Sequence, residues 1–288
     1  MSLVLPPVAA EQIFNIGSFP ITNSIINGWI AVVFFVIIAF LVRNRAALIP
    51  KGLQNVVEGI VEFLLKEVEK VTGDKIRARK FLPIVGTIFL FVLFSNWIGL
   101  LPGTGSIGVW GEVHGEVELI PLLRPAASDL NLTLAMALFA IITSHVMALI
   151  TIGPLNHISK FVNLRGIIRS IKHGPMAIIV AVIEFGVGLI EIVGEVAKVV
   201  SLSLRLFGNI FAGEVLITVM LGLLAYILPI PFMFLELLVG AVQATVFAML
   251  TLAYLVVATE EHGNEEEKDQ KVEKDRKVGK VQNVDAIF

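Results

Sequence analysis

Hydrophobic positions in this sequence form long uninterrupted runs, and polar residues are largely confined to the stretches between them. A transmembrane helix needs about 20 consecutive apolar residues, because each residue adds only about 1.5 Å along the axis. Four runs have about that length, namely residues 25–42, 81–101, 130–152 and 231–257. They predict four membrane-spanning helices.

A fifth run, residues 176–226, is too long for one perpendicular crossing. As a continuous helix it would reach about 75 Å, whereas the hydrocarbon core of a bilayer is about 30 Å thick. The pattern alone allows two spans with a turn near Lys198, or one steeply tilted helix. Pro229 and Pro231 mark the turn before the last run, because proline ends one helix and begins another.

The placement of lysine and arginine favours the single tilted helix, because cytoplasmic loops are enriched in these residues. The segment between the first two runs, residues 160–172 and residues 263–288 are all rich in basic side chains. Residues 101–129, in contrast, hold Arg124 among four acidic residues. Five spans with the N-terminus outside and the C-terminus in the cytoplasm satisfy this distribution, whereas six would not.

Residues 50–71 follow a different pattern, in which apolar side chains recur at helical spacing and charged ones fill the opposite face. This predicts an amphipathic helix on the membrane surface or against a neighbouring helix. The predicted fold is an all-α integral membrane protein with five transmembrane helices, one amphipathic surface helix and a long tilted helical hairpin at the C-terminal side. The expected parts are an external segment (1–24), a polytopic membrane domain (25–262) and a charged, disordered cytoplasmic tail (263–288).

Composition agrees with a membrane protein and excludes several kinds of function. Hydrophobic residues make up 56% of the chain and charged residues 16%, whereas soluble domains carry about 25% charged residues. The absence of cysteine excludes disulfides, thiol catalysis and thiolate metal sites. No phosphate-binding loop of the nucleotide-hydrolase type occurs in the sequence.

We expect no cofactor and no metal, and the net charge of −2 gives no sign of a nucleic-acid partner. His145 is interpreted as a hydrogen-bonded packing residue, and His157 as a solvated loop residue. The N-terminus lacks both a basic signal region and transit-peptide character, which favours a bacterial protein.

Arg205 lies inside the longest apolar run, where a charged side chain is unexpected. A charge at the bilayer centre costs about 2.5–3.5 kcal/mol on insertion scales and about 10–17 kcal/mol in simulations. Asn or Ser would meet a structural role at lower cost, so we interpret Arg205 as a functional residue. Intramembrane ionisable residues often mark an ion path.

Further polar residues fall on the same helical face as Arg205. A helix turns about 100° per residue, so positions 4, 7 or 14 apart lie on one side. The resulting stripe contains Arg205, Asn209, Ser201, Lys198 and Glu191. A stripe of this kind can also simply hold membrane helices together, and for Ser201 both interpretations stay open.

Three polar residues lie outside the stripe. Glu214 is nine residues after Arg205 and therefore faces elsewhere, while Glu236 and Gln243 are seven apart and share a face of the last helix. Buried carboxyl groups can exchange protons with water, while the permanent charge of Arg205 interrupts the path. The combination indicates proton conduction.

The block Ser201-Leu-Ser-Leu-Arg-Leu-Phe-Gly-Asn-Ile-Phe-Ala-Gly-Glu214 resembles subunit a of the F-type ATP synthase. Four further segments are similar to that family, namely residues 96–102, 125–133, 237–247 and 254–262. Together they are spread over the chain between residues 81 and 262, and the arginine block is highly specific.

The resemblance implies that Arg205 is the charge of a stator that faces a rotating ring of subunit c. In the family, protons reach a ring carboxylate through an outer half-channel and leave through an inner one, and the arginine prevents a short circuit. By position, the outer half-channel and the hairpin around Arg205 contain Glu214, Glu236, Asn209 and Gln243, and the inner half-channel contains Glu191, Ser201 and nearby Lys198.

The resemblance further implies a non-catalytic subunit of the F0 sector in a bacterial inner membrane. Its partners would be the subunit c ring, the peripheral stalk of subunit b, the rest of the ATP synthase complex and the lipid bilayer. Whether the coupling ion is H⁺ or Na⁺ depends mainly on the ring. We expect H⁺, because nothing in this sequence suggests a cage of oxygen ligands.

The chain departs from the family at one pair of positions. Many members combine a Glu with a His at the positions of Glu214 and Glu236, whereas this chain has Glu at both. We hypothesise that the two carboxyl groups share one proton at neutral pH. Two other functions compete with the stator: a secondary transporter or channel in which Arg205 binds an anionic substrate, and an anchor without an ion path.

Overall fold

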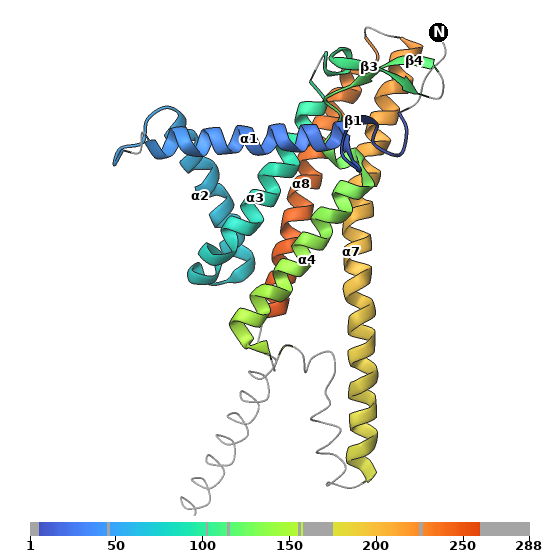
Figure 1. Ribbon diagram of the computed structural model, residues 1–288. Coiled ribbons are helices and arrows are strands. Elements are labelled where there is room, and N and C mark those ends of the chain that lie inside the picture. Colours follow the sequence, from blue (N-terminus) through green and yellow to red (C-terminus); the bar gives the residue numbers. More distant parts are fainter. Residues whose placement is uncertain are drawn as a thin grey trace, which may run out of the picture.

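The computed structural model describes residues 6–44, 47–101, 103–113, 116–154, 157, 175–224 and 227–259. These residues form six α-helices and two antiparallel β-hairpins (Figure 1). The helices are α1 (Asn23–Asn44), α2 (Leu53–Thr72), α3 (Lys75–Gly99), α4 (Leu130–Ile152), α7 (Pro175–Leu223) and α8 (Pro229–Thr259). The hairpins pair β1 (Gln12–Ile16) with β2 (Phe19–Thr22), and β3 (Gly108–Val113) with β4 (Glu116–Pro121). The predicted tail at 263–288 and the basic segment at 160–172 lie outside the described residues.

All the helices except α2 are long and apolar enough to cross a membrane. The predicted all-α membrane fold with five spanning helices is therefore confirmed. The long run that the sequence left ambiguous is one continuous helix, α7, of 49 residues. It forms the expected long hairpin with α8.

The lengths of α1 and α7 constrain how the bundle sits in a bilayer. α1 has 22 residues and α7 has 49, which correspond to about 33 Å and about 73 Å along the axis. Of these two helices, only α1 matches a hydrocarbon core of about 30 Å, and it runs across the long axis of α7 (Figure 1). If α1 lies close to the membrane normal, α7 is steeply tilted.

α3, α4, α7 and α8 pack into one bundle. Its core contains Leu202 and Leu206 of α7 and Phe247 of α8, all almost completely buried. Ala137 and Ala140 of α4 are fully buried as well. Small side chains at these positions let the helices approach closely, as membrane helices commonly do.

α2 is amphipathic, and its two halves have different surroundings. Leu64 and Val68 in the C-terminal half are buried, and Val68 packs with Phe81 of α3 and Leu252 of α8. The N-terminal half exposes apolar side chains such as Val56. The helix therefore lies partly against its neighbours and partly against the surroundings of the bundle.

The end of the bundle that carries the two β-hairpins, here called the hairpin end, is fixed by hydrogen bonds to backbone groups. Nδ2 of the buried Asn27 on α1 donates to the carbonyl oxygens of Ser95 (2.9 Å) and Arg124 (2.6 Å). α4 begins after Asp129, whose carboxylate accepts from the backbone N–H of Asn131 at 3.0 Å. These bonds hold residues 124–129 in place beside α7.

Candidate functional site

Arg205 lies on the exposed face of α7. Leu202 and Leu206 point into the bundle, whereas Ser201, Arg205 and Asn209 are exposed, as the predicted polar stripe requires. Nη2 of Arg205 donates to Oγ of Ser201 at 3.3 Å. No carboxylate among the described residues forms an ion pair with this guanidinium.

Apart from Ser201 and Asn209, the surface around Arg205 is apolar and open. Val200 and Leu204, which come within five residues before Arg205, are exposed. A Cβ atom at Gly208 would meet no atom within 4 Å. The face thus combines one permanent positive charge with an apolar surface. Because Gly208 has no side chain, another helix can pack closely on this surface.

Asn209 connects the stripe to α8. Its Nδ2 donates to Oε1 of Gln243 at 2.7 Å. Gln243 is buried, and its Nε2 has no partner among the described residues. A buried donor without an acceptor is costly, so this amide is suited to bind water or a passing acceptor.

Glu236 is on α8 and lies against Gly213 of α7, which comes one helical turn after Asn209. The side chain is 6% exposed, and its Oε1 has no hydrogen-bond partner among the described residues. The carboxylate packs directly on the backbone of Gly213, where any Cβ atom would overlap with it. Glu236 and Gln243 are both buried, in agreement with the common face that their spacing predicts.

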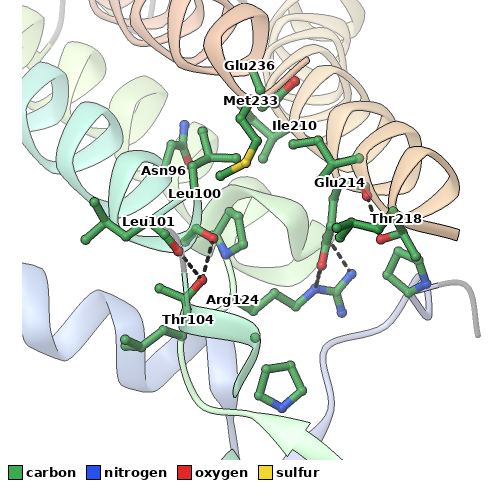
Figure 2. Close-up of a pocket in the computed structure, with 18 of the residues that line it drawn as sticks. Asn96, Leu100, Leu101, Thr104, Arg124, Ile210, Glu214, Thr218, Met233 and Glu236 are labelled. Atoms are coloured by element: carbon green, nitrogen blue, oxygen red, sulfur yellow. Dashed lines mark hydrogen bonds and ion pairs between the residues drawn. The ribbon is translucent and has the colours of Figure 1, made fainter. Parts of the chain in front are cut away.

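Glu236 and Glu214 line the same cavity at the hairpin end, which has a volume of about 730 Å³ (Figure 2). The spacing of residues along α7 and α8 does not predict that these two side chains lie close together. The structure brings them together because Gly213 lets α8 approach α7 immediately before Glu214.

Glu214 is bound to Arg124, which lies between β4 and α4 (Figure 2). Nε of Arg124 is 2.9 Å from Oε1 of Glu214, and Nε and Nη2 donate to Oε2 at 3.1 and 3.0 Å. Arg124 is 3% exposed. From the sequence Arg124 was expected to be a loop charge, although its position as the single lysine or arginine of residues 101–129 was a signal that could have marked it.

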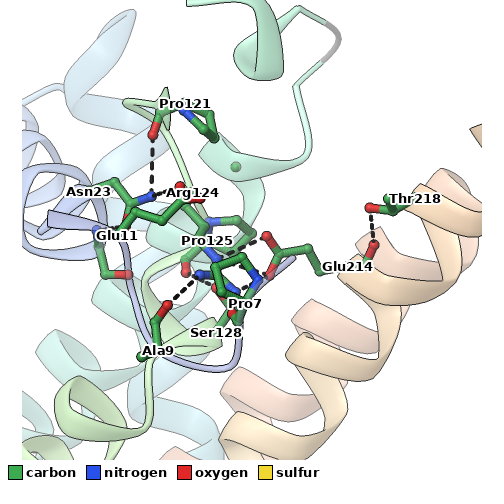
Figure 3. A network of polar contacts seen from close by, with 12 residues as sticks. Pro7, Ala9, Glu11, Asn23, Pro121, Arg124, Pro125, Ser128, Glu214 and Thr218 are labelled. Carbon is green, nitrogen blue, oxygen red and sulfur yellow. Dashed lines mark hydrogen bonds and ion pairs between the residues drawn. The ribbon is translucent and has the colours of Figure 1, made fainter. Parts of the chain in front are cut away.

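The remaining donors of Arg124 hold the N-terminal segment (Figure 3). Nη2 donates to the carbonyl oxygen of Pro7 at 2.8 Å, and Nη1 donates to that of Ala9 at 3.4 Å. Nearby, Nδ2 of Asn23 donates to Oε2 of Glu11 at 3.2 Å. Residues 7–11 are therefore fastened over the cavity.

A second polar cluster lies on α7 towards its N-terminal end. Glu195 accepts from Nζ of Lys198 at 2.7 Å and lies 3.5 Å from Nε2 of His145 on α4. Nδ1 of His145 is 3.2 Å from Nε2 of His157. Nζ of Lys198 also lies over the ring of Tyr254 on α8, 5.4 Å from its centroid. Lys198 therefore contacts Glu195 and the ring of Tyr254 rather than Arg205.

The cluster corrects one expectation. His157 is buried, so its interpretation as a solvated loop residue was wrong. It packs against His145, which contacts it through a ring nitrogen. Glu191 lies half-buried one turn before Glu195. No group of three or more His, Asp or Glu side chains at metal-binding distance is found in the described part of the chain.

Comparison with known proteins identifies the family. The family model described as ATP synthase A chain matches residues 25–256, which include nearly all of the five spanning helices. The chain belongs to this family. The resemblance seen in the arginine block is thereby confirmed.

Individual members are similar over most of their length. ATP synthase subunit a of Moorella thermoacetica is 32% identical over 258 residues, covering 89% of this chain and 99% of that protein. Subunit a of Mycobacterium ulcerans is 34% identical over 244 residues, covering 83% of this chain and 87% of that protein. Subunit a of Gloeobacter violaceus is 32% identical over 240 residues, covering 83% of this chain and 85% of that protein.

Proposed function

We propose that this chain is the non-catalytic stator subunit of an ATP synthase F0 sector, which conducts protons to and from a rotating ring of subunit c. The observation that carries the proposal is the exposed apolar face of α7 with Arg205, which forms no ion pair with any of the described carboxylates. A guanidinium facing lipid is costly, so this face needs a partner that brings a compensating anion. A carboxylate on each subunit of the ring meets that need.

The cavity at the hairpin end supports an outer half-channel. Glu214 and Glu236 contribute carboxyl groups to it, as does Glu11 of the N-terminal segment. From Glu236, the bonded pair of Asn209 and Gln243 leads along the α7–α8 hairpin to Arg205, one helical turn away. Protons would pass from the cavity through Glu236 to the ring carboxylate beside Arg205.

The inner half-channel would lie on the other side of Arg205 along α7. Ser201, which accepts a hydrogen bond from Arg205, and Glu191 belong to it, and Lys198 lies nearby. The permanent charge of Arg205 separates the two half-channels, because it repels a proton that would pass directly between them. Each proton therefore has to travel with the ring.

The proposed setting is a bacterial inner membrane with the hairpin end outside. Residues 1–24 would then be an external segment, and the C-terminal tail would be cytoplasmic. The partners are the subunit c ring, the peripheral stalk of subunit b and the rest of the complex. The membrane potential supplies about 2.3 kcal/mol per charge for each 100 mV, in addition to the pH gradient.

Cross-linking tests the contact face directly, because the chain contains no cysteine. Leu204→Cys places a thiol beside Arg205 at a position that is 49% exposed, and Val36→Cys places one on α1 at a position that is 62% exposed. With a thiol-reactive photocross-linker on assembled complexes, we expect a product with subunit c from the Leu204→Cys variant and none from the Val36→Cys control. A product from the control alone would contradict the proposal.

A further inference from the structure

Glu214 and Glu236 line one cavity but have opposite surroundings. Both carboxylate oxygens of Glu214 lie within 3.1 Å of guanidinium nitrogens of Arg124. Glu236, in contrast, has a buried Oε1 without a hydrogen-bond partner among the described residues. The two carboxyl groups are therefore not equivalent, although the sequence presents them as a matched pair.

Arg124 is permanently charged and donates to acceptors through Nε, Nη1 and Nη2. A guanidinium keeps its proton in proteins and presents a planar fork of N–H donors that matches a carboxylate. Here one edge of the fork binds Glu214, and the remaining donors bind the carbonyl oxygens of Pro7 and Ala9 (Figure 3). Because the carbonyls are neutral, Glu214 supplies the negative charge that a buried arginine requires.

We propose that Arg124 is a positioning residue of the outer half-channel, which holds Glu214 as an oriented anion and fastens the N-terminal segment over the cavity. Glu236 is then the carboxyl group that takes up and releases the transported proton. This inference rests on the proposed function. It replaces the hypothesis that Glu214 and Glu236 share one proton. In its place, Glu214 stays charged and Glu236 carries the transported proton.

The consequence is a specific dependence on charge. The charged groups around the cavity are Arg124, Glu214 and Glu236, with Glu11 on the N-terminal segment that Arg124 holds. Without Arg124, two carboxyl groups would compete for protons in one cavity and would titrate as a coupled pair. Proton transfer would then depend on pH in a different way, even if the fold were intact.

The test uses assembled complexes in inverted membrane vesicles, with ATP-driven acidification recorded over a range of pH. We expect Arg124→Gln to lower the pumping rate at neutral pH by about tenfold and to move the pH profile by about one unit, the usual influence of a neighbouring opposite charge on a carboxyl group. Arg124→Lys retains the charge without the planar fork, and its loss should be smaller.

A double variant distinguishes a positioning role of Arg124 from general structural damage. Since the charge of Arg124 acts on proton transfer through Glu214, the Arg124→Gln/Glu214→Gln double variant should have the pH profile of Glu214→Gln alone, and any further loss of pumping rate should be small and come from the unfastened N-terminal segment. Should Arg124→Gln fail to assemble, the double variant decides, because removing both charges should restore assembly. An unchanged pH profile in Arg124→Gln, a full additive loss in the double variant, or failure of both variants to assemble would each overturn the proposal.

Arg205→Ala in the same vesicles distinguishes this proposal from the function on which it rests. If Arg205→Ala pumps normally, the proposed function fails. If Arg205→Ala does not pump while Arg124→Gln behaves as wild type, the function stands and the role of Arg124 is refuted.

Discussion

Two arginines of this chain have opposite surroundings within one bundle. Arg124 is buried and its guanidinium is bonded to Glu214 and to two backbone carbonyls. Arg205 is exposed on an apolar face and donates to Ser201 only among the described residues. The first arrangement fixes a carboxylate in place, whereas the second leaves a charge free to meet a succession of partners. The difference in pairing, and not the residue type, separates the two roles.

Gly213 gives a prediction at the same scale, because a Cβ atom there would overlap with the carboxylate of Glu236. The carboxylate is the end of a flexible side chain and its Oε1 has no bond to lose, so we expect it to move while the fold survives. Gly213→Ala should lower proton pumping about tenfold or more, since small displacements of a reacting group are costly. The melting temperature of the complex should stay nearly constant.

Gly59→Ala on α2 is the matched control, because a Cβ atom at that position meets no atom within 4 Å. Pumping should be unchanged there, and replacing a helical glycine should stabilise the subunit by up to about 1 kcal/mol. A Gly213→Ala complex that pumps at the wild-type rate would show that the close approach of α7 to Glu236 has no functional importance.

Single-residue patterns could be predicted where they depend on one helix. The period of the α-helix placed Ser201, Arg205 and Asn209 on one face, and the structure agrees. Contacts between elements could not be predicted in this way. Arg124 and Glu214 are 90 residues apart in the sequence, and no periodicity relates a loop to a helix.

At the scale of elements, length and hydrophobicity identified the spanning helices because a bilayer imposes both. The two hairpins left no such signal. Their strands have only four to six residues, and β1 and β2 are largely exposed, so strict alternation of apolar and polar residues is absent. α2 was recognised from its amphipathic pattern, but only the structure shows that its C-terminal half packs on α3 and α8.

At the scale of the whole molecule, the crossing of α1 and α7 connects the fold to its proposed setting (Figure 1). A helix as long as α7 stays within a bilayer only if it is steeply tilted. The tilt lays a long, exposed apolar face along the membrane with Arg205 within it. Such a face suits a partner that moves past it.

The proposed orientation can be measured with single cysteines on the two sides of α1, before and after it in the sequence. Val8 lies before α1 and is 62% exposed, while Leu48 lies after it and is fully exposed. With a membrane-impermeant maleimide, we expect Val8→Cys to react in intact spheroplasts and Leu48→Cys to react only in inverted vesicles. The reverse pattern would place the N-terminus in the cytoplasm and contradict the proposed topology.

The central claim is that Arg205 couples proton movement to the ring, and ATP-driven acidification of inverted vesicles tests it most directly. Arg43→Ala is the matched control, since Arg43 is an exposed arginine in the last turn of α1. Assembled Arg205→Ala complexes should hydrolyse ATP but produce no acidification, while the control pumps like the wild type. Normal acidification by Arg205→Ala would contradict the account, because a half-channel path without the separating charge could not drive protons in one direction.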